Sequence, residues 1–309
     1  PSPSALVNNV RFQKFICEGI NVPVRKNDGS TQVLKVNLFD FDNPSNNQFL
    51  VINQFSITEH QYTKRPDLVV FVNGLPLVVF ELKSATEENV DIGNAYNQIR
   101  NYIKTIPSLF NYNSFAVISD GINAKAGTIT SSEDRFMSWR TMEGSKIAPQ
   151  NVPQLEVLIK GMFRKETLLD IVKNFILFQG DNSEYVKIMA GYHQYHAVNK
   201  AITSTTKAIS IQGDRRAGVI WHTQGSGKSL TMVFYVGKLV TNSVLDNPTI
   251  VVITDRNDLD DQLYETFSKS KDILRNTPAQ ASDRVHLRLL LNQRRSEERR
   301  GGQQCRCRW

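Results

Sequence analysis

The chain has 309 residues, of which 40% are hydrophobic and 22% charged, and 37 basic against 30 acidic residues give a net charge of +7. This composition is typical of a globular protein of about two domains and excludes disordered, collagen-like and disulfide-scaffold classes. No apolar run reaches the roughly 18–20 residues of a membrane-spanning helix, and the first residues lack a signal-peptide pattern. With three cysteines forming no framework, we expect a cytoplasmic protein without a membrane partner.

Residues 1–148 are predicted to form a mixed α/β domain. Turn residues separate six runs rich in β-branched and aromatic side chains, as expected of strands. Apolar side chains at helical spacing predict one helix over Val90–Ile106. The predicted strands are Val33–Phe41, Phe49–Phe55, Leu68–Val72, Leu75–Lys83, Phe115–Ser119 and Lys125–Thr130.

Residues 149–184 are predicted to be a helical linker, with helices over Leu155–Phe163 and Thr167–Phe178. From 185 to 293 helices and strands alternate, which is typical of a parallel, doubly wound sheet. The expected order is helix 186–203, strand 217–221, helix 228–241, strand 249–254 and helix 258–269.

Residues 294–309 differ from everything before them. They contain six arginines against two glutamates, and two of the three cysteines. A basic arm for nucleic acid is one interpretation. We favour the other, a disordered and non-native tail, so that the overall positive charge is weak evidence for a polyanionic partner.

A glycine-rich loop lies between the predicted strand 217–221 and helix 228–241. Glycines let backbone N–H groups surround phosphate oxygens, and a helix N-terminus adds partial positive charge. The lysine of such a loop reaches the β- and γ-phosphates, and Ser229 can coordinate Mg²⁺. His222 stands where the strict motif has its first glycine, but the rest is intact, so we predict nucleotide binding. The loop residues are Gly225, Ser226, Gly227, Lys228 and Ser229.

Three ionisable side chains lie within two apolar strands of the first domain. Asp67 precedes strand 68–72, and Glu81 and Lys83 lie two apart on strand 75–83, so they share a face. Charged groups are costly on such strands unless they are paired or bind a metal. Asp67 and Glu81 can hold Mg²⁺, and Lys83 can activate a water or stabilise charge on a phosphate. The alternative is a buried Glu–Lys ion pair with a capping aspartate.

The register of this hairpin decides between the two interpretations. A two-residue turn at Asn73 and Gly74 would pair Asp67 with Phe80 and put Asp67 and Glu81 on opposite faces. A three-residue loop with a glycine bulge would pair Asp67 with Val79 and bring the carboxylates to one face. The sequence-based hypothesis of a metal site therefore predicts the bulged loop.

Two further polar side chains accompany these carboxylates. Gln98 and Tyr102 lie four residues apart on the predicted helix, so both point to one side of it. They could line a phosphate channel beside the metal site, or they could belong to ordinary surface and core packing.

Taken together, residues 10–293 resemble the restriction (R) subunit of type I restriction–modification enzymes. The first part resembles that family's PD-(D/E)xK endonuclease domain, a restriction-endonuclease-like mixed sheet. The matching segments are NPSNN at 43–47, NQF at 53–55, RPD at 65–67, NGLP at 73–76 and ELKS at 81–84. The resemblance implies that Asp67, Glu81 and Lys83 are catalytic residues, and the family's Gln-x-x-x-Tyr element matches Gln98 and Tyr102.

The second part is similar to the first RecA-like domain of superfamily 2 translocases. Residues 192–198 resemble an adenine-recognition element, which gives Gln194 that role. Residues 221–232 match the family's P-loop, including His222 and Gln224. Residues 251–263 resemble motif Ia, which contacts the DNA backbone, and imply that Thr254, Asp255 and Arg256 are DNA contacts.

The resemblance implies an enzyme that uses Mg²⁺ and ATP to translocate and cleave double-stranded DNA, in complex with methyltransferase (M) and specificity (S) subunits. The family's Asp-Glu-x-His box and second RecA-like domain do not follow motif Ia in this sequence. We therefore expect a truncated motor domain at 185–293 that lacks translocation activity. Two alternatives are a DNA repair helicase with a degenerate nuclease-like domain and a non-catalytic ATP- or DNA-binding module.

Overall fold

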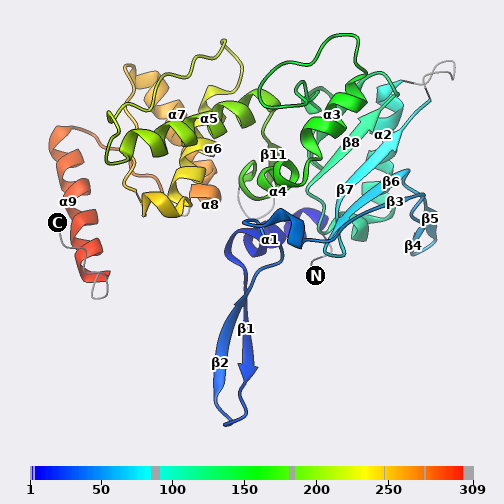
Figure 1. The fold of residues 1–309 in the computed structure, drawn as a ribbon, viewed down its shortest axis with the longest axis horizontal. Coiled ribbons are helices and arrows are strands. Elements are labelled where there is room, and N and C mark those ends of the chain that lie inside the picture. The colour runs from blue at the N-terminus through cyan, green and yellow to red at the C-terminus, as the bar shows by residue number, and fades with distance from the viewer. Residues whose placement is uncertain are drawn as a thin grey trace.

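The structure is a computed structural model that describes residue 2 and residues 4–84, 91–180, 185–246, 248–274 and 276–301, with side chains up to residue 293. The chain forms a mixed α/β structure in which a five-stranded sheet and a group of helices lie on either side of a helical segment (Figure 1). Within the described residues, no helix is both long enough and apolar enough to cross a membrane.

The five-stranded sheet is mixed, as predicted for the first domain. Its order is β3-β6-β7-β8-β9; β7 and β8 run parallel, and the other neighbours are antiparallel. The strands are β3 (Phe49–Asn53), β6 (Leu68–Val72), β7 (Leu75–Leu82), β8 (Phe115–Ser119) and β9 (Ala124–Gly127). All five residues of β8 are buried, as expected of a central strand covered on both faces.

Helix α2 (Ile92–Thr105) packs against the sheet and contacts β7 and β8. The Asp91 side chain accepts a hydrogen bond from the Asn94 backbone N–H and caps the helix. Its buried residues recur at helical spacing and join the core under one face of the sheet. The helix was predicted to begin at Val90, which lies outside the described residues.

The N-terminal segment departs from the prediction. Helix α1 (Ala5–Glu18) was not predicted, and the strand predicted over Val33–Phe41 is β2 (Thr31–Val36), which pairs with an unpredicted β1 (Ile20–Arg25). This hairpin projects away from the rest of the molecule (Figure 1). A second small hairpin consists of β4 (Ile57–Glu59) and β5 (Tyr62–Lys64).

The predicted linker contains α3 (Gln154–Met162) and α4 (Lys165–Asn174), close to their predicted bounds. The prediction that the second helix continues to Phe178 is wrong, because β10 (Ile176–Gln179) pairs with β11 (Val186–Met189) in an antiparallel hairpin. The predicted helix 186–203 accordingly begins later, as α5 (Tyr192–Ile209). A short apolar run is compatible with a helix or a strand, and here the cross-strand pairing makes residues 176–179 a strand. The described part of the predicted linker ends at residue 180, since 181–184 lie outside the described residues.

The C-terminal part contains α6 (Lys228–Val240), α7 (Asn257–Lys269), α8 (Lys271–Leu274) and α9 (Arg284–Gly301). The predicted strands 217–221 and 249–254 are not formed, and no parallel sheet is present among the described residues from 185 to 301. Val219 and Ile253 are 96% and 86% exposed. A strand needs a partner for its backbone groups, and these two segments do not pair with each other.

The backbone of residues 294–301 continues α9, so the prediction of a disordered tail is wrong for these residues. Residues 302–309 lie outside the described residues.

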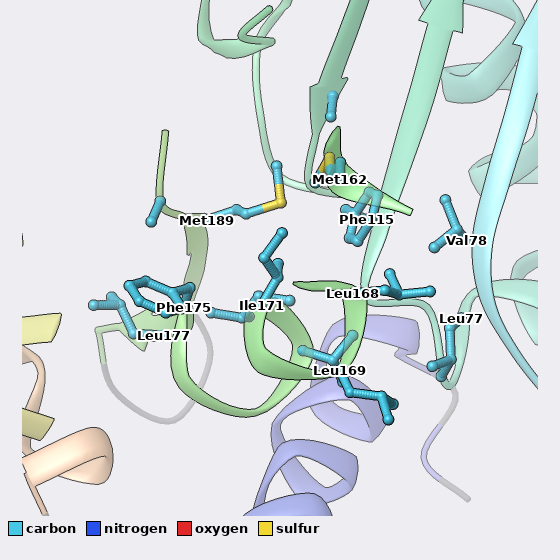
Figure 2. Close-up of a cluster of buried hydrophobic side chains, with 14 of the residues drawn as sticks. Leu77, Val78, Phe115, Met162, Leu168, Leu169, Ile171, Phe175, Leu177 and Met189 are labelled. Atoms are coloured by element: carbon cyan, nitrogen blue, oxygen red, sulfur yellow. The ribbon is translucent and has the colours of Figure 1, made fainter. Parts of the chain in front are cut away.

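One hydrophobic core connects the sheet with the C-terminal helices. Figure 2 shows Val78 and Phe115 of the sheet, Met162, Leu168 and Ile171 of the linker helices, and Phe175 and Met189 beside β10 and β11. Phe175 is fully buried between the rings of Tyr195 and Phe234, with centroids 4.8 Å and 5.7 Å away. The helical segment is thus packed into the core on both sides, and does not behave as a free linker.

Candidate functional site

The β6–β7 hairpin brings the carboxylates together by a different route from the predicted one. Asn73 and Gly74 have φ angles of 49° and 81°, so the connection is a tight two-residue turn of type I′. The predicted three-residue loop is wrong. A bulge lies farther along, where Phe71 pairs with Pro76 but Val70 pairs with Val78, leaving Leu77 as the extra residue. Beyond the bulge Leu68 pairs with Phe80, so the next position sets Asp67 opposite Glu81.

Asp67 is held by neutral hydrogen-bond donors. Its Oδ2 accepts from the backbone N–H of Leu82 at 2.8 Å, and its Oδ1 accepts from Nε2 of Gln54 at 2.9 Å. The first bond crosses the hairpin and ties the carboxylate of one strand to the backbone of the other. Both oxygens keep accepting capacity, because a carboxylate oxygen has two lone pairs.

Glu81 is 3% exposed and lies on β7, a strand that is apolar apart from this side chain. Lys83 donates from Nζ to its Oε1 at 2.7 Å. Burial raises the pKa of Glu81; the hydrogen bond from Lys83 opposes the rise, and the charge of Asp67 adds to it. The last effect indicates that the two carboxylates are electrostatic neighbours.

Tyr102 lies on the buried face of α2, and its hydroxyl donates to the backbone carbonyl of Arg65 at 3.4 Å. Burial raises the pKa of Tyr102; a side-chain hydrogen bond with Gln98 opposes the rise, and the charge of Glu81 adds to it. The structure therefore brings Asp67, Glu81, Lys83, Gln98 and Tyr102 into one neighbourhood, the set that the sequence analysis selected.

The donor set of this site fits Mg²⁺, which prefers carboxylate oxygens. The second oxygen of Glu81, Oε2, is buried and has no hydrogen-bond partner among the described residues. A buried unpaired acceptor is unfavourable, and a cation between Glu81 and Asp67 would satisfy it. Within the described parts of the chain, no three or more His, Cys, Asp or Glu side chains gather closely enough to hold a metal. The protein would therefore supply two carboxylates, and Mg²⁺ would keep several waters, as it usually does.

The glycine-rich loop, predicted to bind phosphate, leads directly into α6. Gly225 and Gly227 both have φ of 78°, a left-handed conformation that favours glycine, and Gly227 is the N-cap of α6. Nζ of Lys228 donates to the backbone carbonyls of His222 and Thr223 at 3.3 Å and 3.2 Å. Ser229 follows in the first turn of α6, and Gln224 is exposed in the loop. The loop is thus formed although the strand expected before it is not.

The first turn of α5 supports this loop. Gln194 is 5% exposed; its Oε1 accepts from the Gly191 N–H at 2.9 Å, and its Nε2 donates to the Gly227 carbonyl at 3.1 Å. His193 contacts the Ser226 carbonyl through Nε2 at 3.0 Å. The structure thus uses the Gln194 amide inside the protein, and the contact with adenine stays a prediction.

The three predicted DNA contacts lie just before α7. Thr254 is half-buried, Asp255 and Arg256 are exposed, and Arg256 is the N-cap residue of the helix. Oγ1 of Thr254 donates to Asp260 Oδ1 at 3.4 Å. No described hydrogen bond joins these residues to the P-loop.

The sequence analysis missed Gln54 as a site residue. It lies at the end of β3, well before the hairpin in the sequence, and only the pairing of β3 with β6 brings it beside Asp67. The segment containing it was among the matching motifs, but nothing in its spacing indicated a contact with Asp67.

Residues 2–135 match the family described as the type I restriction enzyme R protein N terminus, and residues 193–299 match the SWI2/SNF2 ATPase family. The chain is 45% identical over 292 residues to the type I restriction enzyme HindI endonuclease subunit of Haemophilus influenzae, which covers 93% of this chain and 28% of that protein. It is 36% identical over 280 residues to the putative type I restriction enzyme MjaIXP endonuclease subunit of Methanocaldococcus jannaschii. This match covers 83% of this chain and 26% of that protein.

The chain therefore belongs to the family of type I restriction enzyme R, or endonuclease, subunits. It spans about a quarter of the length of the curated relatives that it matches.

Proposed function

We propose that this chain carries the endonuclease site and the ATP-binding loop of a type I restriction enzyme R subunit. The whole subunit would couple Mg²⁺-dependent cleavage of double-stranded DNA to ATP-driven DNA translocation. The observation that supports this most is the β6–β7 bulge, which sets Asp67 opposite Glu81 and leaves an unpaired Glu81 oxygen beside Lys83.

Each residue of the first site has a proposed role. Asp67 and Glu81 would hold Mg²⁺, which as a Lewis acid polarises the scissile phosphate and lowers the pKa of a bound water. Lys83 would orient the attacking water or stabilise the charge that develops on the phosphate. Gln98 and Tyr102 would line the path of the DNA backbone, because Tyr102 lies near the carboxylates and Gln98 hydrogen-bonds to it.

The second site is proposed to bind ATP with Mg²⁺. The N–H groups of residues 225–229 would surround the phosphates at the N-terminus of α6. Lys228 would exchange the carbonyls of His222 and Thr223 for the β- and γ-phosphates, and Ser229 would coordinate the cation. Gln194 would contact adenine, and Thr254, Asp255 and Arg256 would contact the DNA backbone.

The fold proposed for the whole is a restriction-endonuclease-like domain followed by a RecA-like motor domain, spanning 1–148 and 185–293 and joined by residues 149–184. We propose that methyltransferase and specificity subunits complete the enzyme and read the DNA sequence.

The first prediction tests the two sites separately. In the complete complex, Asp67→Ala removes a metal ligand, and we expect DNA cleavage to fall by more than about 100-fold while the ATPase rate is retained, because a catalytic metal supplies several kcal/mol. Lys228→Ala should abolish both activities. Plasmid cleavage and phosphate release measure them. Normal cleavage by the Asp67→Ala complex would show that the endonuclease assignment is wrong.

A repair helicase with a degenerate nuclease-like domain was one of the two alternatives. It predicts that Glu81 is neutralised by a distant arginine. In the structure the partner of Glu81 is Lys83, two residues away on the same strand, and the second carboxylate oxygen is left unpaired. The Glu81–Lys83 ion pair is also what a purely structural pair predicts, so the support for the endonuclease is the Glu81 Oε2 that has no hydrogen-bond partner among the described residues.

A further inference from the structure

Gln54 has an unusual backbone conformation for its residue type. Its φ is 50°, in the left-handed region that residues other than glycine, asparagine and aspartate rarely adopt. It follows Asn53, the last residue of β3, and Asn53 pairs with Leu68 of β6. Local strain of this kind persists where surrounding contacts stabilise it, and it is often associated with functional sites.

The contacts that accompany this conformation all go to Asp67. The backbone N–H of Gln54 donates to the Asp67 carbonyl at 2.9 Å, and Nε2 of its side chain donates to Oδ1 of Asp67 at 2.9 Å. Oδ2 of Asp67 accepts from the Leu82 N–H at 2.8 Å. One donor on each oxygen fixes the rotation of the carboxylate about its Cβ–Cγ bond, which neither donor alone would do.

The charge of the partner differs between the two carboxylates of the site. Glu81 is paired with the cation of Lys83, whereas Gln54 and Leu82 offer Asp67 only neutral donors. A neutral donor orients a carboxylate without cancelling its charge. The donors that orient Asp67 therefore carry no positive charge that would compete with a divalent cation.

We propose that Gln54 is a positioning residue that orients Asp67 and thereby sets the affinity of the site for a divalent cation. This inference rests on the proposed function, in which Asp67 is a metal ligand. Residues that orient a metal ligand commonly contribute 10- to 100-fold to metal affinity. The left-handed backbone of Gln54 aims its side chain at Asp67, and the strain that this costs is offset by the contacts it permits.

The second prediction separates this role from a structural one by replacing Gln54 in two ways. Gln54→Met removes the donor at similar volume, and Gln54→Gly removes it while relieving the backbone strain. We expect both to weaken Mn²⁺ binding by about 10-fold or more. Gln54→Gly should leave the protein at least as stable to urea as the parent chain. A structural residue would instead lower stability and affinity together.

His60→Gly is the matched control, since His60 is exposed and has φ of 53° but makes no contact with Asp67 in the structure. It should change stability without changing Mn²⁺ affinity. Titration calorimetry of the 309-residue chain with Mn²⁺ measures binding directly, and Asp67→Ala is the reference for a lost ligand.

The outcomes distinguish a failure of the proposed metal site from a failure of the proposed role of Gln54. If Asp67→Ala binds Mn²⁺ as tightly as the parent chain, the proposed metal site is wrong. If Asp67→Ala abolishes binding but both Gln54 variants bind normally, the metal site stands and the role of Gln54 is overturned. If Gln54→Gly loses stability in step with affinity, Gln54 is structural and the inference also fails.

Discussion

The sheet of the N-terminal part and the P-loop region of the C-terminal part contain the same kind of apolar segment, with opposite results. All five residues of β8 are buried between neighbouring strands, whereas segments 217–221 and 249–253 run as unpaired chain. Composition does not separate them clearly, because all three are mainly apolar and contain valine and isoleucine. The difference shows that such a run becomes a strand only where partner strands satisfy its backbone groups.

The two candidate sites differ in the same way. The carboxylate site depends on tertiary pairing, since a bulge in β7 and the neighbouring β3 bring Asp67, Glu81 and Gln54 together. The proposed phosphate-binding loop depends on local geometry, namely two left-handed glycines and the first turn of α6. Loss of the five-stranded sheet would therefore remove the carboxylate site but leave the glycine-rich loop nearly intact.

The largest expected effect compares two isoleucines. Ile118 of β8 is fully buried and Ile253 is 86% exposed. Ile118→Ala should lower the free energy of unfolding by about 2–5 kcal/mol through lost burial and the cavity it leaves. Ile253→Ala should change it by less than about 0.5 kcal/mol. Urea denaturation measures both, and a large loss from Ile253→Ala would mean that segment 249–253 is a buried strand in solution.

A smaller effect is expected in the P-loop. A Cβ at Gly227 would lie 2.8 Å from Nε2 of Gln194, and the backbone φ there is 78°. Gly227→Ala should lower stability by about 1–2 kcal/mol through left-handed strain. It should also displace Gln194 from the loop and weaken binding of a fluorescent ATP analogue. Gly144→Ala is the control, since Gly144 has φ of 55° in open space. Equal ATP affinities for the two variants would contradict the proposed support of the loop by Gln194.

A pH dependence of stability is expected where β11 packs against the N-terminal part of the chain. Lys187 of β11 is 3% exposed, and Nζ donates to Asn9 Oδ1 at 2.6 Å and to the Asn113 carbonyl at 2.5 Å. Burial lowers the pKa of Lys187 to about 7. Between that value and the unfolded pKa of about 10.4, the unfolded chain holds a proton that the folded chain lacks, so stability rises with pH.

The expected slope is at most about 1.4 kcal/mol per pH unit for this single proton. Urea denaturation between pH 7 and 9 should detect it in the parent chain, and Lys187→Met should reduce it. Lys165→Met, which removes an exposed lysine over the Phe49 ring, should leave the slope unchanged. Identical slopes in the parent and Lys187→Met would mean that Lys187 stays charged in the fold.

Residue spacing grouped the candidate site residues along the chain, and their roles in both sites remain predictions. Glu81 and Lys83 were assigned to one face from their spacing alone, and Gln98 and Tyr102 from helical periodicity. The register of the hairpin was wrong in detail, because a one-residue bulge inside β7 has no sequence signal comparable to that of the Asn73-Gly74 turn. The contact of Gln54 with Asp67 depends on which strand lies beside β6, and local spacing carries no such information.

The amino-acid sequence by itself determined the elements whose causes are local. The left-handed positions of the glycine-rich loop require glycine, and the Asp91 side chain caps α2. Only the tertiary structure decided which apolar runs pair as strands and whether the two carboxylates meet. A strand satisfies its backbone through partners distant in the chain, and a shift of one residue in that pairing moves a side chain to the opposite face.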